Sequence, residues 1–93
     1  MKEKAFETIV DKIDYRDGFK MTFANGFTIS VVFGKYTFSD GGETTAEVAA
    51  WDSQDNWLMF DGEKWFETEE YSDVMARQTA GEVAKLIYTL SQW

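Results

Sequence analysis

The segment from Phe19 to Phe33 restricts the possible folds of this chain more than any other stretch. Apolar residues alternate with polar ones on both sides of Ala24-Asn25-Gly26. Alternation is typical of a strand with one buried face, and Asn-Gly between two such runs is a strong β-hairpin signal. We therefore expect an antiparallel hairpin here, with a sheet built around it.

The hydrophobic pattern also predicts the length of the hairpin turn. A two-residue turn would pair Phe23 with Thr28, which sets an apolar side chain opposite a polar one. A shift of one residue moves every side chain to the other face, so register is sensitive to this choice. A three-residue loop, with Gly26 in the left-handed position of a bulge, keeps the apolar residues together. Its pairs are Phe23 with Phe27, Met21 with Ile29, and Phe19 with Val31.

Three more strands are predicted after the hairpin, at residues 45–51, 57–60 and 63–68. The polar stretch 52–56 separates the first two, and Asp61-Gly62 separates the second from the third. Residues 57–60 read Trp-Leu-Met-Phe without alternation, which is typical of a strand covered on both faces. The C-terminal helix is expected to cover one face, and an N-terminal helix or a partner chain the other.

Two helices are predicted, one at each end of the chain. Thr79-Ala80-Gly81-Glu82 fits a capping box, and the apolar residues behind it repeat at helical spacing, so a helix is expected from about residue 80 to residue 91. Residues 3–13 also place their apolar side chains on one helical face, which favours a short amphipathic helix. The run Thr8, Ile9 and Val10 leaves a strand as the alternative.

Together these elements predict one α+β domain spanning residues 1–93. The expected architecture is an antiparallel sheet of four or five strands, with the C-terminal helix packed on one face and a short N-terminal helix. The chain has no proline and no repeat that would mark a domain boundary.

The composition excludes several kinds of chemistry. The chain has neither cysteine nor histidine. It therefore lacks disulfides, thiol nucleophiles and thiolate metal ligands, and it also lacks the commonest general base. The longest apolar runs have four residues and the N-terminus shows no signal-peptide core, so a cytoplasmic protein that does not enter a membrane is expected.

Acidic residues are concentrated in one third of the chain. The segment from Asp40 to Asp73 holds eleven acids and one base, Lys64, whereas both flanks are nearly neutral. A one-sided negative field attracts basic partners and repels nucleic acid and anionic membranes. The alternative is that the acids only keep the protein soluble.

A docking surface for a basic protein is the functional interpretation of this asymmetry. Tyr36 and Trp57 are candidate aromatic anchors beside it, although core packing is the simpler explanation for most of the aromatics. The candidate partner-binding acids are Asp52, Asp55, Asp61, Glu67, Glu69, Glu70 and Asp73.

No pattern indicates catalysis, a metal site or a bound cofactor. Asp52, Gln54, Asn56 and Glu63 have the spacing of calcium ligands, but Trp57 stands where such a loop needs glycine, so a polar β-turn is expected. Gly41-Gly42 lacks the Lys-Ser/Thr that follows in a phosphate-binding loop. The acids could only support metal-dependent hydrolysis if they converged, and their spread along the chain argues against this.

The hairpin and the segment behind it resemble a known group of sequences. The residues are FKMTFANGFTISV (19–31), AEVAAWD (46–52) and Asn56-Trp57. They are similar to an FxNGxTxSVxxG hairpin followed by AEVAAWDxxxNW, found in small bacteriophage- and prophage-encoded proteins. The resemblance covers about residues 19–90. Many relatives have a cysteine-containing segment after the hairpin, whereas this chain has Gly34-Lys35-Tyr36-Thr37, so no role of that thiol carries over.

The resemblance implies a phage accessory protein that binds a host protein. Small acidic phage proteins include inhibitors of nucleases, CRISPR effectors and other defence systems. The expected function is thus non-enzymatic modulation of a basic host protein in the bacterial cytoplasm, by a monomer or a homodimer. The alternative is a small-molecule or nucleotide-binding module with its pocket between the sheet and the helix.

Overall fold

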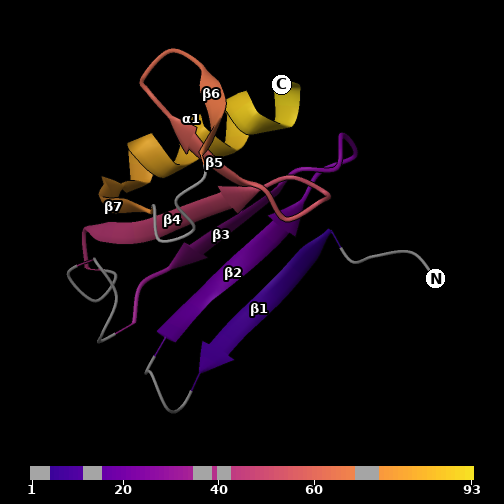
Figure 1. Ribbon diagram of the computed structural model, residues 1–93. Coiled ribbons are helices and arrows are strands. Elements are labelled where there is room, and N and C mark those ends of the chain that lie inside the picture. The colour runs from indigo at the N-terminus through magenta and orange to yellow at the C-terminus, as the bar shows by residue number, and fades with distance from the viewer. Residues whose placement is uncertain (1–4, 12–15, 35–38, 40–42, 69–73) are drawn as a thin grey trace.

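The computed structural model describes residues 5–11, 16–34, 39, 43–68 and 74–93. One antiparallel sheet and one C-terminal helix make up the fold (Figure 1). Six strands follow each other in the order of the chain, and a seventh, β7, pairs separately with β4. The elements are β1 (Phe6–Asp11), β2 (Arg16–Thr22), β3 (Thr28–Val32), β4 (Thr45–Trp51), β5 (Trp57–Phe60), β6 (Trp65–Thr68), β7 (Met75–Thr79) and α1 (Ala80–Gln92).

The α+β class is confirmed, but the expected count of four or five strands is too low. The three-residue hairpin loop is confirmed: Met21 lies opposite Ile29, and the Phe23 amide donates to the Phe27 carbonyl over 2.8 Å. Gly26 has a φ of 92°, a left-handed conformation that glycine adopts without a steric penalty.

The predicted N-terminal helix is wrong. Phe6–Asp11 forms β1, the outermost strand, which pairs with β2 so that Phe6 lies opposite Met21 and Thr8 opposite Phe19. An isolated helix of this length is only marginally stable in water. The β-branched run from Thr8 to Val10 favours a strand once β2 offers an edge to pair with.

β7 was not predicted at all. It occupies the edge of β4 opposite β3, beside the N-terminal half of β4, while Ala50 and Trp51 at the other end pair with β5. Its sequence MARQT does not alternate. The pairing contains a bulge, and Arg77 has a φ of 53° there. Such an irregular strand has no period-2 pattern that could be recognised in advance.

The core lies between α1 and one face of the sheet. Leu86 and Leu90 of the helix are buried with Ile29, Val48 and Ala50 of β3 and β4. The capping box is confirmed, because the Glu82 amide donates to the Thr79 hydroxyl and the Thr79 amide donates to the Glu82 carboxylate.

In β5, residues 57–60, Leu58 is buried and the other three residues are half-buried. The N-terminal helix that was expected to cover the second face of residues 57–60 is absent, because that segment forms β1.

The hairpin loop also caps the end of the helix. The Asn25 side-chain amide donates to the Leu90 carbonyl at 2.9 Å and approaches those of Ser91 and Trp93 at 3.3 and 3.4 Å. The ring of Trp93 stacks on Phe27 with 5.0 Å between centroids. Carbonyls of the last helical turn lack the usual partner one turn further on, and the Leu90 carbonyl accepts only a long bond of 3.3 Å from the Trp93 amide. The donor supplied by Asn25 therefore stabilises this end.

An Asn25→Asp variant tests this cap. The carboxylate can still accept from the Phe27 amide, as the Asn25 oxygen does at 3.2 Å, so the turn is preserved. The donor is lost, and a negative charge faces the negative end of the helix dipole. We expect the free energy of unfolding to fall by about 1–2 kcal/mol in urea denaturation. A variant as stable as the wild type would contradict the capping role.

Candidate functional site

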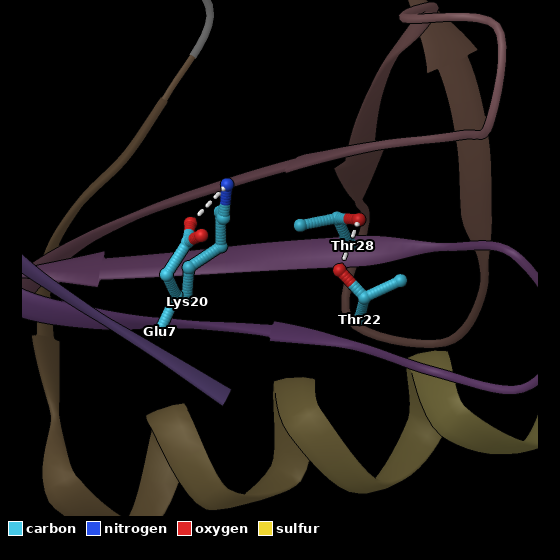
Figure 2. Close-up of polar contacts among 4 residues, drawn as sticks. All are labelled: Glu7, Lys20, Thr22 and Thr28. Carbon is cyan, nitrogen blue, oxygen red and sulfur yellow. Dashed lines mark hydrogen bonds and ion pairs between the residues drawn. The ribbon is translucent and has the colours of Figure 1, made fainter. Parts of the chain in front are cut away.

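The face of the sheet turned away from α1 carries a row of side chains across neighbouring strands. Figure 2 shows Thr22 and Thr28 on this face, with the helix on the other side of the sheet. Their hydroxyl oxygens are hydrogen-bonded at 3.0 Å. Thr28 lies opposite Trp51, and Trp51 opposite Trp57. Thr68 of β6 follows, opposite Trp57. Because directly opposed residues share a face, both tryptophans lie on the side away from the helix.

Lys20 stands on the same face but its charge is compensated. Its Nζ lies 2.6 Å from the Glu7 carboxylate, which comes from the adjacent strand β1 (Figure 2). Trp51 and Trp57 lie at the other end of the row, next to the acidic segment. Two carboxylates, those of Asp55 and Glu67, line the cavities at that end.

Two adjoining cavities make up what we call the acidic notch, formed by Trp51, Asp55, Asn56, Trp57, Glu67 and Thr68. The larger has a volume of about 500 Å³ and the smaller about 290 Å³, and both are lined by Asp55 and Trp57. The rings of Trp51 and Trp57 are half-buried, 5.6 Å apart and inclined at 67°. Glu67 lies opposite Leu58 in the register, so it borders the notch from the other face of the β5–β6 hairpin.

The polar turn between β4 and β5 positions Asp55 at the notch. The Asp52 carboxylate accepts from the Gln54 and Asn56 amides at 2.8 and 2.9 Å and from the Asn56 side chain at 3.0 Å. Those bonds, chiefly the one from the Asn56 side chain, lower the pKa of Asp52. Asp55 is exposed and has a φ of 64°, a conformation that aspartate and asparagine tolerate. The expected polar turn is thus confirmed.

A similar turn joins β5 to β6. The Asp61 carboxylate accepts from the Glu63 and Lys64 amides, each at 2.8 Å. These bonds, with the Lys64 amide contributing most, lower the pKa of Asp61. β6 consequently begins at Trp65 rather than at residue 63. Asp52 and Asp61 therefore order their turns, whereas Asp55 and Glu67 have no ion-pair partner in the described part of the chain.

The structure brings together three of the predicted site residues: Asp55, Glu67 and Trp57. Tyr36, Glu69, Glu70 and Asp73 lie outside the described residues. Sequence reasoning did not assign Trp51, Asn56 and Thr68 to the site. Trp51 could be placed beside Trp57 only through the pairing of β4 with β5, since its position on an alternating strand is equally typical of a core residue.

A third cavity, of about 390 Å³, lies between the sheet and the helix. It is open and mostly apolar, with Val83 and Ile87 of α1 on one side and Val31 and Phe33 on the other. Glu43 is the charged residue in its lining. A carboxylate without a lysine or arginine disfavours the phosphates of a nucleotide.

No group of three or more metal-ligating side chains occurs among residues 5–11, 16–34, 39, 43–68 and 74–93. Within the same part of the chain, no helix has the length and apolar character needed to cross a membrane. No protein-family model matches the chain, and no curated protein or solved structure matches it significantly.

The lowered pKa of Asp52 predicts an effect of acid on stability. A carboxyl group with a depressed pKa in the folded state stabilises the fold above its unfolded value of about 3.9, and this contribution disappears as the pH falls through the folded pKa. We expect the wild type to be more stable than Asp52→Asn at pH 7, with the difference shrinking below about pH 4. Urea denaturation of both proteins at several pH values measures it. A difference independent of pH would contradict this role of the carboxylate.

Proposed function

We propose that this protein is a non-enzymatic binding protein whose acidic notch receives a basic side chain of a partner protein. The observation that carries the proposal is the joint placement of Trp57, Asp55 and Glu67 around one open cavity, at the end of the β5–β6 hairpin where Trp57 lies opposite Thr68. An aromatic ring and a carboxylate both attract a cation, by different physical effects that add in the same place.

The surroundings of the notch support a cationic partner. Residues 43–68 contain seven acids and one base, Lys64. Such an excess accelerates the encounter with a basic surface and makes binding sensitive to salt. It also disfavours direct contact with nucleic acid, whose phosphates the same field repels.

The biological setting of the proposal comes from the sequence resemblance. Similarity to small phage and prophage proteins suggests a cytoplasmic accessory protein that acts on a host protein, in the manner of an anti-defence inhibitor of a nuclease or a CRISPR effector. Such targets carry basic surfaces for nucleic acid, which the acidic surface could occupy. Both monomer and homodimer are compatible with this mode of binding.

Neutralising variants of the notch test the proposal. A basic protein isolated from host lysate on the wild-type chain would be purified and titrated calorimetrically with each variant. We expect Asp55→Asn and Glu67→Gln each to weaken binding about five- to tenfold, which corresponds to about 1–1.4 kcal/mol. Asparagine tolerates the backbone conformation of residue 55, so the fold is preserved.

Asp17→Asn is the matched control for these variants. Asp17 is exposed and lies at the opposite end of β2 from Thr22, the residue that begins the row leading to the tryptophans. The substitution removes the same charge, so a general effect of net charge would appear equally in the control. Equal affinities for the wild type, Asp55→Asn and Glu67→Gln, or binding unchanged at 0.5 M salt, would rule out the notch as the binding site.

A second candidate function rests on the cavity between the sheet and the helix. Its apolar lining and its volume of about 390 Å³ suit a small apolar molecule, in the size range of ordinary ligand pockets. Binding of such a ligand would raise the melting temperature by mass action. A Val83→Trp variant should abolish that shift while leaving partner binding at the notch intact.

A further inference from the structure

We infer that the side chain received by the acidic notch is an arginine, in preference to a lysine. This inference rests on the proposed function and specifies the chemistry of the partner. Three features carry it: the paired tryptophan rings, the set of hydrogen-bond acceptors, and the openness of the cavity to water.

The tryptophan pair favours a planar cation. Trp51 and Trp57 are inclined at 67°, so the two rings present differently oriented apolar surfaces to the notch. A guanidinium is flat and can lie against an aromatic surface while its edge stays free for hydrogen bonds. An ammonium group is a compact point charge and cannot stack in this way.

The polar groups of the notch are mainly acceptors. Asp55 and Glu67 contribute carboxylates. The NH2 group of the Asn56 side chain donates to the Asp52 carboxylate, which leaves the side-chain carbonyl oxygen of Asn56 as an acceptor. Guanidinium carries five N–H donors and no acceptor, so it suits a site whose lining offers several acceptors. A carboxylate can also accept two parallel bonds from arginine.

The cost of removing water from the charged group also favours arginine over lysine. Asp55 and Asn56 are exposed, and the larger cavity opens to solvent. A lysine ammonium is strongly hydrated and gains little by leaving water for such a site. The more weakly hydrated guanidinium loses less on entry and gains contact with the rings. Consistent with this, arginine is enriched in protein interfaces relative to the rest of the surface, whereas lysine is depleted.

A titration followed by heteronuclear NMR tests the inference on the full chain. Three capped pentapeptides with otherwise uncharged residues are used, identical except for a central arginine, lysine or citrulline. We expect the arginine peptide to shift the indole N–H signals of Trp51 and Trp57 and the amides of Asp55 and Asn56. Its affinity should exceed that of the lysine peptide at least about threefold, because stacking and paired hydrogen bonds are lost with lysine. Citrulline has nearly the same shape without the charge and should leave the signals unchanged.

Variants of the notch connect the shifts to the site. Asp55→Asn should weaken the arginine titration several-fold and Asp17→Asn should not. Lysine binding as tightly as arginine, an equal response to citrulline, or no response to the arginine peptide would each overturn the preference for arginine. If the purified partner nevertheless lost affinity for Asp55→Asn and Glu67→Gln, the proposed function would stand without it. Retention of the partner by both variants would refute the proposed function itself.

Discussion

The Gly18→Ala variant is expected to lose about 3 kcal/mol or more of its free energy of unfolding. A Cβ atom at Gly18 would lie 2.0 Å from the Val31 carbonyl oxygen and 2.8 Å from the Val32 Cα. Both are backbone atoms of the neighbouring strand β3, so no side-chain rotation can relieve the overlap. The β2–β3 pairing would have to open where Gly18 lies opposite Val32.

This loss is large for a domain of 93 residues, whose total stability is about 5–14 kcal/mol by the usual value per residue. Thermal unfolding followed by circular dichroism should show the melting temperature reduced by about 12–24 °C. Gly81→Ala is the matched control, because nothing lies within 4 Å of a Cβ at that position in the first turn of α1. Alanine is the better helix former, so the control should gain up to about 1 kcal/mol.

A Gly18→Ala variant within 0.5 kcal/mol of the wild type would show that β2 does not approach β3 so closely. Equal destabilisation of both glycine variants would mean that the overlap with β3 is not the cause of the loss. The free energy of unfolding is expected to fall in Gly18→Ala and to rise in Gly81→Ala. This opposite response therefore tests the close approach of the two strands, and not the effect of replacing any glycine by alanine.

The Trp65→Ala variant is expected to have the second large effect, a loss of about 3–5 kcal/mol. Trp65 is only 3% exposed and holds the β5–β6 hairpin on the helix. Its indole N–H donates to the Thr89 hydroxyl at 2.9 Å, and its ring lies 5.3 Å from that of Phe60. Truncation would remove both contacts and leave a cavity between the hairpin and α1.

Two further substitutions separate packing from hydrogen bonding at Trp65. Trp65→Phe keeps most of the ring contact with Phe60 and should cost less than the alanine variant. Thr89→Val keeps the volume but leaves the buried indole N–H without its acceptor, a loss of about 1–3 kcal/mol. Urea denaturation measures the free energy of unfolding of each of the three variants and so ranks them. Equal stability of Trp65→Ala and the wild type would mean that the hairpin is not anchored through this residue.

Anchoring of the hairpin also bears on the notch, because Trp65 and Thr68 lie at opposite ends of the same short strand, β6. Loosening β6 from the helix would allow Glu67 and Thr68 to move relative to Trp57. At a temperature where it is still folded, Trp65→Phe is therefore expected to weaken partner binding less than Asp55→Asn does. Stability and binding can be measured separately on that variant.

Several elements could be predicted from the sequence because their signals are local. The turn at Asn25-Gly26 and the alternating residues around it determine the hairpin register. The capping box at Thr79 and the helical spacing behind it determine where α1 begins. β4 and β5 have the predicted bounds, since polar turns flank both. In each case neighbouring residues contain all the necessary information.

Other features depended on contacts between distant parts of the chain. Residues 6–11 became a strand only because β2 was available for pairing, and β7 fills the free half of the β4 edge without an alternating pattern. Asn25 caps a helix end 65 residues further on, although its sequence context indicates only a turn. Gly18 gives no sign in the sequence of how closely β3 approaches it.

The candidate site also combines features that are visible in the sequence with features that depend on tertiary contacts. The excess of acids in residues 40–73 is visible in the sequence, and so is the number of aromatics. Which of them meet is decided by the register of β4, β5 and β6, which places Trp51 beside Trp57 and leaves Asp52 and Asp61 bonded within their turns. Local propensity is a property of neighbouring residues, whereas a binding site is a juxtaposition of strands. Only the tertiary pairing, stabilised by burial of the core, could create it.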